Sequence, residues 1–154
     1  AAQNILAGLE IQSPSTSRVV EYRGIDGLKQ MNFNLSKANK EFRVFELASL
    51  HKHIGNHFAD KMSEVFTQKG LTTYDLTNNP DRDKEPGVSS PLNYVAYIDQ
   101  KLFKIEFETY IYDNVVGLLN YENDDIFGVE IYSEKLARQQ NQIFDLIWQQ
   151  AQVL

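Results

Sequence analysis

All three histidines of the chain fall within one short stretch, LASLHKHIGNHFAD (47–60). His53 and His57 are four residues apart, so on one continuous helix they would lie on the same polar flank, one turn apart. Two histidines at this spacing can hold a zinc ion, as in the H-E-x-x-H motif. The glutamate that serves as the base in that motif is missing, because Ile-Gly-Asn separates the two histidines. Solvated histidines are the favoured interpretation, and a metal site at His53 and His57 is the weaker alternative.

His51 follows a predicted strand and opens a predicted helix. Ligands of α/β proteins bind at such junctions between strand ends and helices. The sequence leaves two interpretations open: His51 contacts a ligand, or it is a partly buried histidine with its hydrogen bonds satisfied within the protein. Glu46, near the end of the preceding strand, is grouped with His51 as a candidate ligand-binding residue.

A second group of ionisable residues contains Glu106, Glu108 and Asp113. Alternate residues of a strand point to the same side, so Glu106 and Glu108 would share one face. Two carboxylates on one face can act as acid and base, or bind a cation or sugar hydroxyls. The other interpretation is a polar stripe that faces solvent. We take Glu106 and Glu108 as candidate ligand-binding residues together with the first pair.

The first half of the chain alternates between short β-type segments and segments with apolar residues at helical spacing. In chain order the predicted elements are a strand at 18–22, a helix at 24–39, a strand at 41–47, a helix at 50–69 and a strand at 71–77. This order is typical of a parallel sheet. Gly70 is the expected C-terminal cap of the second helix.

The second half begins with a polar, proline-rich stretch, 78–91, which we expect to be an exposed loop. Four β-rich segments follow, LNYVAYI, LFKIEFETYIY, NVVGLLNY and FGVEIY, and predict mostly antiparallel strands. A closing helix is expected after Ser133, which can serve as its N-cap. The predicted fold is therefore α/β, with a mixed sheet flanked by helices and one domain spanning 18–154.

Composition narrows the classes of function. The net charge of −6 does not attract phosphate backbones, so we expect DNA contact only through another segment. The chain has no cysteine, which excludes disulfides and zinc ribbons, and a cytoplasmic location is expected. No apolar run approaches the roughly 20 residues of a membrane span, so no membrane partner is expected. Residues 1–17 are interpreted as the end of a helical linker, broken at Ser13 and Pro14.

Several segments together resemble a known family. EYRGIDGLKQM resembles the E-x-x-G-I-x-G-I/L opening of the effector domain in TrmB-like transcriptional regulators. HFADKMSEVFTQKGLTTYDL resembles that family's helix, turn and second strand. ETYIYDNVVGLL and FGVEIYSEKLARQQNQIFDLIWQQA resemble its closing strands and helix. The resemblance covers residues 19–152 in the right order.

The resemblance implies a fold like one half of a phospholipase-D-like enzyme. Those enzymes use H-x-K-x-x-x-x-D, in which the histidine attacks phosphorus and the lysine binds phosphate. When Asp113 is aligned with the aspartate, Glu106 stands at the histidine position and Glu108 at the lysine position. Two anions there repel a phosphodiester. The expectation is a catalytically degenerate domain with no catalytic residues and no cofactor.

Members of the resembling family sense ligands, often sugars, and control transcription through an N-terminal winged helix-turn-helix domain. By resemblance we expect an effector domain that binds a small molecule, with a sugar as the first candidate. We also expect a homodimer, and DNA contact only through a domain outside this chain. Two alternatives stay open. One is a divergent phosphodiesterase or a metal-dependent hydrolase using His53 and His57, and the other is a pure dimerisation module whose interface holds exposed Tyr110, Tyr112 and Tyr132.

Overall fold

A computed structural model describes residues 17–86 and 91–154. Apart from Ser17, the predicted linker lies outside the described residues. The strands are β1 (Arg18–Arg23), β2 (Glu41–Glu46), β3 (Thr72–Thr77), β4 (Asn93–Tyr97), β5 (Glu108–Tyr112), β6 (Val115–Asn120), β7 (Phe127–Tyr132) and β8 (Gln152–Val153). The helices are α2 (Gly24–Asn34), α3 (His51–Ile54), α4 (Asn56–Gln68) and α5 (Glu134–Trp148), with short 3-10 helices η1 (Leu35–Lys37) and η2 (Arg82–Lys84).

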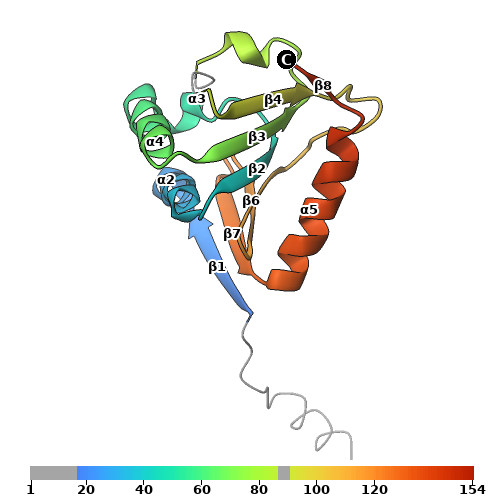
Figure 1. Cartoon of the computed structure of the whole chain (residues 1–154). Helices are drawn as coiled ribbons and strands as arrows, with labels where there is room; N and C mark the ends of the chain where they lie inside the picture. The colour runs from blue at the N-terminus through green and yellow to red at the C-terminus, as the bar shows by residue number, and fades with distance from the viewer. Residues whose placement is uncertain (1–16, 87–90) are drawn as a thin grey trace, which may run out of the picture.

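The strands form one eight-stranded mixed sheet in the order β1-β7-β6-β5-β2-β3-β4-β8 (Figure 1). Strand β3 is parallel to both β2 and β4, and the other neighbours are antiparallel. The predicted parallel pairing is confirmed for β2 with β3, whereas β1 pairs antiparallel with β7 at the edge of the sheet. The predicted mostly antiparallel second half is confirmed for β5, β6 and β7, whereas β4 is parallel to β3. In the parallel pair, Glu46 lies opposite Thr77, so β2 and β3 end at the same edge of the sheet.

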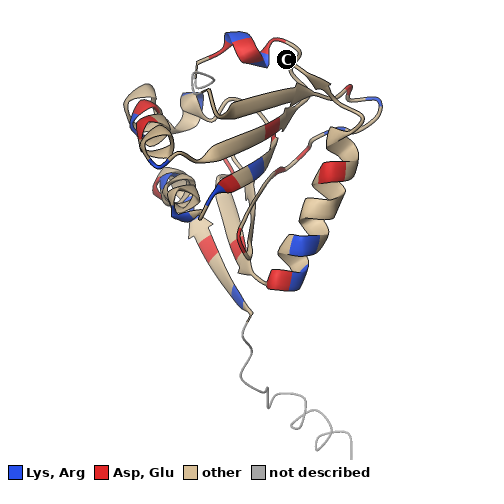
Figure 2. Cartoon of the chain, viewed as in Figure 1, with Lys and Arg blue, Asp and Glu red and all other residues tan. Residues whose placement is uncertain are grey.

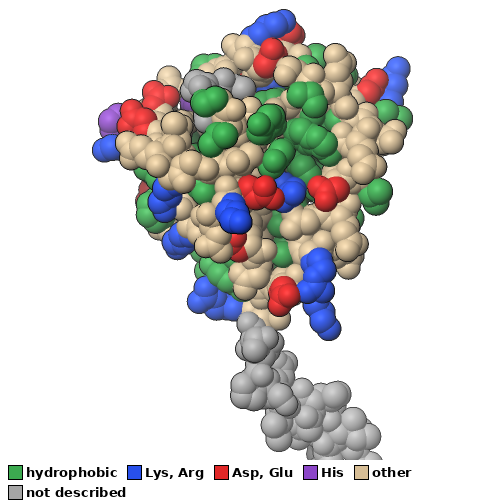
Figure 3. Space-filling model, viewed as in Figure 1, with side chains coloured by type: hydrophobic (Ala, Val, Ile, Leu, Met, Phe, Trp, Pro, Cys, Tyr) green, Lys and Arg blue, Asp and Glu red, His purple; other side chains and the backbone are tan. Residues whose placement is uncertain are grey.

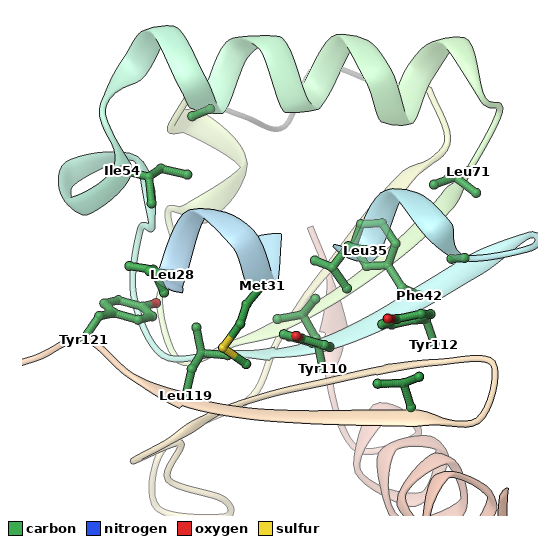
Figure 4. Close-up of a cluster of buried hydrophobic side chains, with 14 residues drawn as sticks. Leu28, Met31, Leu35, Phe42, Ile54, Leu71, Tyr110, Tyr112, Leu119 and Tyr121 are labelled. Atoms are coloured by element: carbon green, nitrogen blue, oxygen red, sulfur yellow. The ribbon is translucent and has the colours of Figure 1, made fainter. Parts of the chain in front are cut away.

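Helices cover both faces of the sheet, with α2 and α4 on one side and α5 on the other (Figure 1). Strand β2 contributes to both layers, because successive side chains of a strand point to opposite faces. Its Phe42 and Val44 pack with α2 and α4, whereas Phe45 packs with Phe144 of α5. Figure 4 shows the first of these clusters, in which Leu28 and Met31 of α2 face Tyr110 and Leu119 of the sheet. Within the described residues, no helix is long and apolar enough to cross a membrane.

The predicted continuous helix at 50–69 is wrong, because Gly55 divides it into α3 and α4. Gly55 has a φ of 82°, a conformation that glycine adopts without steric cost. Its N–H still bonds to the His51 carbonyl, while its own carbonyl accepts from Ala59 at the start of α4. The predicted cap at Gly70 is confirmed, with a φ of 65°.

The predicted strand LFKIEFETYIY forms only in its second half, from Glu108 onward. The preceding backbone is held by a side chain instead of by a neighbouring strand. The Asn78 amide donates to the carbonyls of Ile98 and Phe103 at 2.9 Å and accepts from the Ile105 N–H at 2.8 Å. These bonds replace strand pairing, and they cannot be inferred from local hydrophobic alternation.

The expected exposure of Tyr110 and Tyr112 is also wrong, since they are 2% and 5% exposed. Tyr110 donates to the fully buried carboxylate of Glu130 at 2.5 Å, and Tyr22 and Tyr132 donate to the same carboxylate. Tyr110 is turned inward because this buried carboxylate needs hydrogen-bond donors, and Tyr112 packs in the same core cluster. The expected N-cap of α5 is confirmed, because the Ser133 side chain accepts from the Leu136 N–H.

Candidate functional site

A cavity of about 120 Å³ lies between the sheet and the helices α2 and α4. A single water needs only roughly 10–15 Å³, so this volume accommodates several waters or a small organic molecule. The apolar part of the lining includes Leu35, Phe42, Val44, Met62 and Phe66. The polar part of the lining includes Glu46, His51, Thr73, Asp75, Arg82 and Glu108, and Thr73 and Asp75 lie beside Phe42 and Val44 on the neighbouring strand. The cavity therefore suits a molecule with distinct apolar and polar parts.

Glu46 and Arg82 form a buried ion pair in the polar part of the lining. The Arg82 Nε donates to Glu46 Oε1 at 2.6 Å, and its Nη1 donates to the Pro86 carbonyl at 3.2 Å. Both side chains are nearly inaccessible, at 7% and 11% exposure. Burial raises the pKa of Glu46, while the Arg82 guanidinium acts in the opposite direction. The pair is electrically neutral when ionised, so the charge of the cavity depends on the remaining carboxyl groups.

Asp75 is a buried carboxyl group in the interior of β3, opposite Val44. Burial is the main cause that raises the pKa of Asp75, to about 7, and the neighbouring charge of Glu46 adds to the shift. Arg82 and a hydrogen bond with Asn93 lower it by less. The shift favours the protonated, neutral form of Asp75.

Glu108 is the second buried carboxyl group without a cation of its own, and burial raises its pKa to about 8. The Tyr121 hydroxyl lies 2.5 Å from Glu108 Oε2 and 2.7 Å from the Ala48 carbonyl oxygen. A hydroxyl has one proton and donates it to only one acceptor. A protonated Glu108 fits this geometry, because it donates to Tyr121 while Tyr121 donates to Ala48.

Two polar atoms in the cavity wall, Thr73 Oγ1 and His51 Nε2, are buried and have no hydrogen-bond partner among the described residues. Thr73 is 7% exposed. Burial and then Arg82 lower the pKa of His51, so its imidazole is neutral at neutral pH. Buried polar atoms are rarely without partners in proteins. Both atoms can therefore bond to a molecule that enters the cavity.

Three of the four candidates from the sequence, Glu46, His51 and Glu108, line this cavity, and Glu106 does not. Glu106 precedes β5, has a 73% exposed side chain and pairs with Lys104 at 2.9 Å. The expectation that Glu106 and Glu108 share one strand face is therefore wrong. The carboxyl groups that do share the cavity with Glu108 come from β2 and β3.

The weaker alternative of a metal site is not supported by the geometry of its two histidines. His53 belongs to α3 and His57 to α4, so the break at Gly55 removes their one-turn relation. The His53 ring instead packs on the Tyr121 ring, with 4.8 Å between centroids. In residues 17–86 and 91–154 no group of three or more His, Asp and Glu side chains is placed to hold a metal ion.

Sequence reasoning missed Thr73, Asp75, Arg82 and Tyr121. Asp75 carries a usable signal, because it is a carboxylate inside a strand, TTYDLT, that is predicted to lie in a parallel sheet. Arg82 carries none, since it is one of several charges in the polar loop and only the tertiary structure buries it. Tyr121 likewise reaches the cavity residues only because β6 runs beside β5.

No protein-family model matches the sequence, and no curated protein is a detectable relative. Solved structures do match. TrmBL2, described as an archaeal chromatin protein with a novel mode of DNA binding, has a TM-score of 0.63 at 18% identity over 98% of this chain. The present chain spans 60% of the length of TrmBL2.

Two smaller proteins match over almost their whole length. NucT from Helicobacter pylori has a TM-score of 0.66 at 12% identity, covering 90% of this chain and 99% of NucT. Nuc from Salmonella typhimurium, a phospholipase D family member, has a TM-score of 0.63 at 10% identity, covering 90% and 98%. The chain has a phospholipase-D-like fold. The predicted fold class is thereby confirmed, and identities this low extend the likeness to the fold alone.

Glu106 and Glu108, which the sequence aligns with the H-x-K part of the phospholipase-D-like motif, lie in different surroundings. Glu106, which the motif alignment on Asp113 places at the histidine, faces solvent, and Glu108, which it places at the lysine, lies in the cavity. Phospholipase-D-like structures include both a DNA-binding chromatin protein and a phospholipase D family member. The function of this chain must therefore be argued from its cavity.

Proposed function

We propose that the chain is the effector domain of a TrmB-like transcriptional regulator, and that its cavity binds a small polar molecule. The observation that carries the proposal is the cavity in which buried Thr73 Oγ1 and His51 Nε2 have no partner among the described residues. The fold shared with TrmBL2 supports the regulatory role. A sugar remains a candidate ligand, because carboxyl groups such as Glu108 bond readily to hydroxyls.

We further propose that ligand binding is transmitted through α2 to β1 and from there to a DNA-binding domain that precedes β1. Asn32 of α2 and Leu35 of the following η1 line the cavity, and α2 follows β1 without an intervening residue. Asn34 at the end of α2 donates to the Tyr22 hydroxyl of β1 at 3.1 Å. A shift of α2 on ligand binding would therefore move β1. Such coupling requires a ligand that prefers one of two arrangements of the domain.

A thermal-shift screen against sugars, sugar phosphates, nucleotides and amines tests the binding step. A ligand at about 100 times its dissociation constant stabilises the folded chain by roughly 2.7 kcal/mol, which is several degrees in a domain of this size. We expect the stabilisation to weaken in Asp75→Asn and Glu108→Gln and to persist in Glu106→Gln, whose side chain lies outside the cavity. Equal stabilisation of all variants would contradict binding in the cavity.

We infer that the chain is not a phosphodiesterase. A phosphodiester entering the cavity would meet three carboxyl groups, and the guanidinium of Arg82 is already paired with Glu46. We expect no hydrolysis of bis-p-nitrophenyl phosphate above background. Turnover that is lost in His51→Ala would overturn this inference and restore the enzyme alternative.

The pure dimerisation alternative loses the interface that the sequence suggested, because Tyr110 and Tyr112 are buried. Hydrophobic side chains instead gather on the surface near β3, β4 and α5 (Figure 3). Tyr74 and Tyr94 stack there at 5.4 Å, and Trp148 packs edge-on against Tyr74. We still propose a homodimer, which light scattering of the purified chain tests directly. A monomer at all concentrations would contradict it.

A further inference from the structure

Carboxyl groups outnumber cations in the polar part of the cavity lining. Glu46, Asp75 and Glu108 contribute carboxyl oxygens, and the unpartnered Thr73 Oγ1 and His51 Nε2 can both accept. The donor in this part of the lining with a fixed charge is the Arg82 guanidinium. Its bonds to Glu46 and to the Pro86 carbonyl already engage two of its nitrogens. The lining also holds the neutral donors of Asn32, Ser63 and Asn93, so the excess of carboxyl groups over cations is the feature that favours a cationic ligand.

The charged groups of the lining are unequal in number. Three carboxyl groups face one guanidinium, and the described lining contains no lysine and no second arginine. Arg82 is bonded to Glu46 at 2.6 Å. Asp75 and Glu108 are hydrogen-bonded to neutral groups, Asp75 to Asn93 and Glu108 to Tyr121 and the Leu47 N–H, and no cation of the described residues bonds to them. A buried carboxylate is stable only when it is paired or hydrogen-bonded. A cationic ligand would supply the charge that the chain itself does not place there.

The apolar part of the lining limits the remainder of such a ligand. Phe42 and Phe66 meet edge to face with 5.1 Å between centroids, and Leu35, Val44 and Met62 surround them. The cavity of about 120 Å³ is close to the roughly 150 Å³ of an engineered apolar cavity that binds benzene. The whole ligand, its polar end included, is therefore about the size of one small ring with a short substituent or of a short alkyl chain.

We propose that the cavity binds a small amphiphilic organic cation, with a primary ammonium group between Asp75 and Glu108 and an apolar body against Met62 and Phe66 of α4. This inference rests on the proposed function, because it takes the same cavity as the ligand site. It narrows the ligand class from sugars to amines. The pKa values of Asp75 and Glu108, raised to about 7 and about 8, agree with it, since burial without a cation raises both.

The test is a nuclear magnetic resonance titration of the purified chain with benzylamine, with benzyl alcohol as its neutral isostere and with glucose. We expect benzylamine to shift the backbone resonances of Thr73, Asp75 and Glu108. We expect it to bind roughly ten- to a hundred-fold more tightly than benzyl alcohol, because its hydrogen bonds are charge-assisted. Asp75→Asn combined with Glu108→Gln should abolish this preference, and Glu106→Gln should retain it.

Other outcomes overturn the inference in distinguishable ways. Binding of glucose, or of benzyl alcohol as tightly as benzylamine, would refute the amine and leave the proposed sensor intact. If none of the three compounds shifted a resonance at millimolar concentration, binding of an amine would be refuted. If the thermal-shift screen also found no stabilising compound, the proposed function would fail as well. Should the doubly substituted chain lose its folded spectrum, the ratio of the two isosteres on the wild-type chain still decides the question.

Discussion

At the scale of single residues, the cavity depends on carboxyl groups that are buried without a cation beside them. Asp75 and Glu108 have pKa values raised to about 7 and about 8, chiefly by burial. In the unfolded chain both would titrate near pH 4. Between about pH 4 and about pH 8 the folded state therefore holds protons that the unfolded state has released. The free energy of unfolding must fall as pH rises through this range.

This proton linkage predicts the pH dependence of stability. The contribution of the two groups is fully present below about pH 4 and is lost as pH rises through 7 and 8. We expect the melting temperature to fall as pH rises from about 5.5 to about 8.5. The fall should be roughly 2–4 °C for each kcal/mol by which the free energy of unfolding decreases. Asp75→Asn combined with Glu108→Gln should flatten the profile, and Glu106→Gln should not. A flat wild-type melting profile would show that the two groups are ionised throughout.

Gly117 provides a prediction about the core. A Cβ built on Gly117 would overlap with the ring of Tyr110, which is held in place by its bond to Glu130. We expect Gly117→Ala to lower the free energy of unfolding, measured in urea, by about 1–3 kcal/mol or more, the cost typical of overpacking. Leu118→Ala, on the same strand, removes atoms instead and serves as a comparison. Unchanged stability of Gly117→Ala would mean that the Tyr110 ring lies elsewhere.

The sequence allowed part of the site to be predicted at this scale. Glu46 and His51 were identifiable because they mark a strand end and a helix start, positions that topology makes meaningful. The sequence predicts Glu108 from its spacing with Glu106, but the two side chains do not share a site. Glu108 lines the cavity because it is the first residue of β5, whereas Glu106 precedes the strand. Thr73 and Arg82 became candidates only in the folded structure, since their importance lies in burial and in their partners.

At the scale of elements, periodicity located most strands and helices but not the interruptions between them. The break between α3 and α4 depends on one backbone conformation at Gly55, and the late start of β5 depends on bonds from Asn78 across the chain. Neither leaves a trace in hydrophobic alternation. Both matter for the site, because the first separates His53 from His57 and the second removes Glu106 from the cavity.

The polar loop after β3 is attached to β2 by the pair of Arg82 with Glu46. Removing one partner of a buried ion pair leaves an uncompensated charge and typically costs about 3–5 kcal/mol. We expect Arg82→Met to lower the free energy of unfolding, measured in urea, by about 3–5 kcal/mol. Arg82→Met combined with Glu46→Gln should recover much of the loss, because no unpaired charge remains. A double variant less stable than Arg82→Met alone would contradict this account.

At the scale of the whole molecule, the two faces of the sheet have different characters. The layer under α5 is apolar, whereas the layer under α2 and α4 combines apolar packing with the polar cavity. Acidic and basic residues occur together on both α4 and α5 (Figure 2), so neither helix offers a basic stripe for nucleic acid. A regulatory role for this domain therefore requires that the cavity communicate with a separate reader of DNA.

The most direct test of coupling between the cavity and β1 is backbone hydrogen exchange. It is measured on the chain with and without the compound that stabilises it most in the thermal-shift screen. The account predicts slower exchange around the cavity in β3 and α2, and protection that extends into β1 through the bond of Asn34 to Tyr22. Protection of the cavity strands with unchanged exchange in α2 and β1 would contradict transmission to the N-terminal side. Protection confined to elements away from the cavity would contradict the site itself.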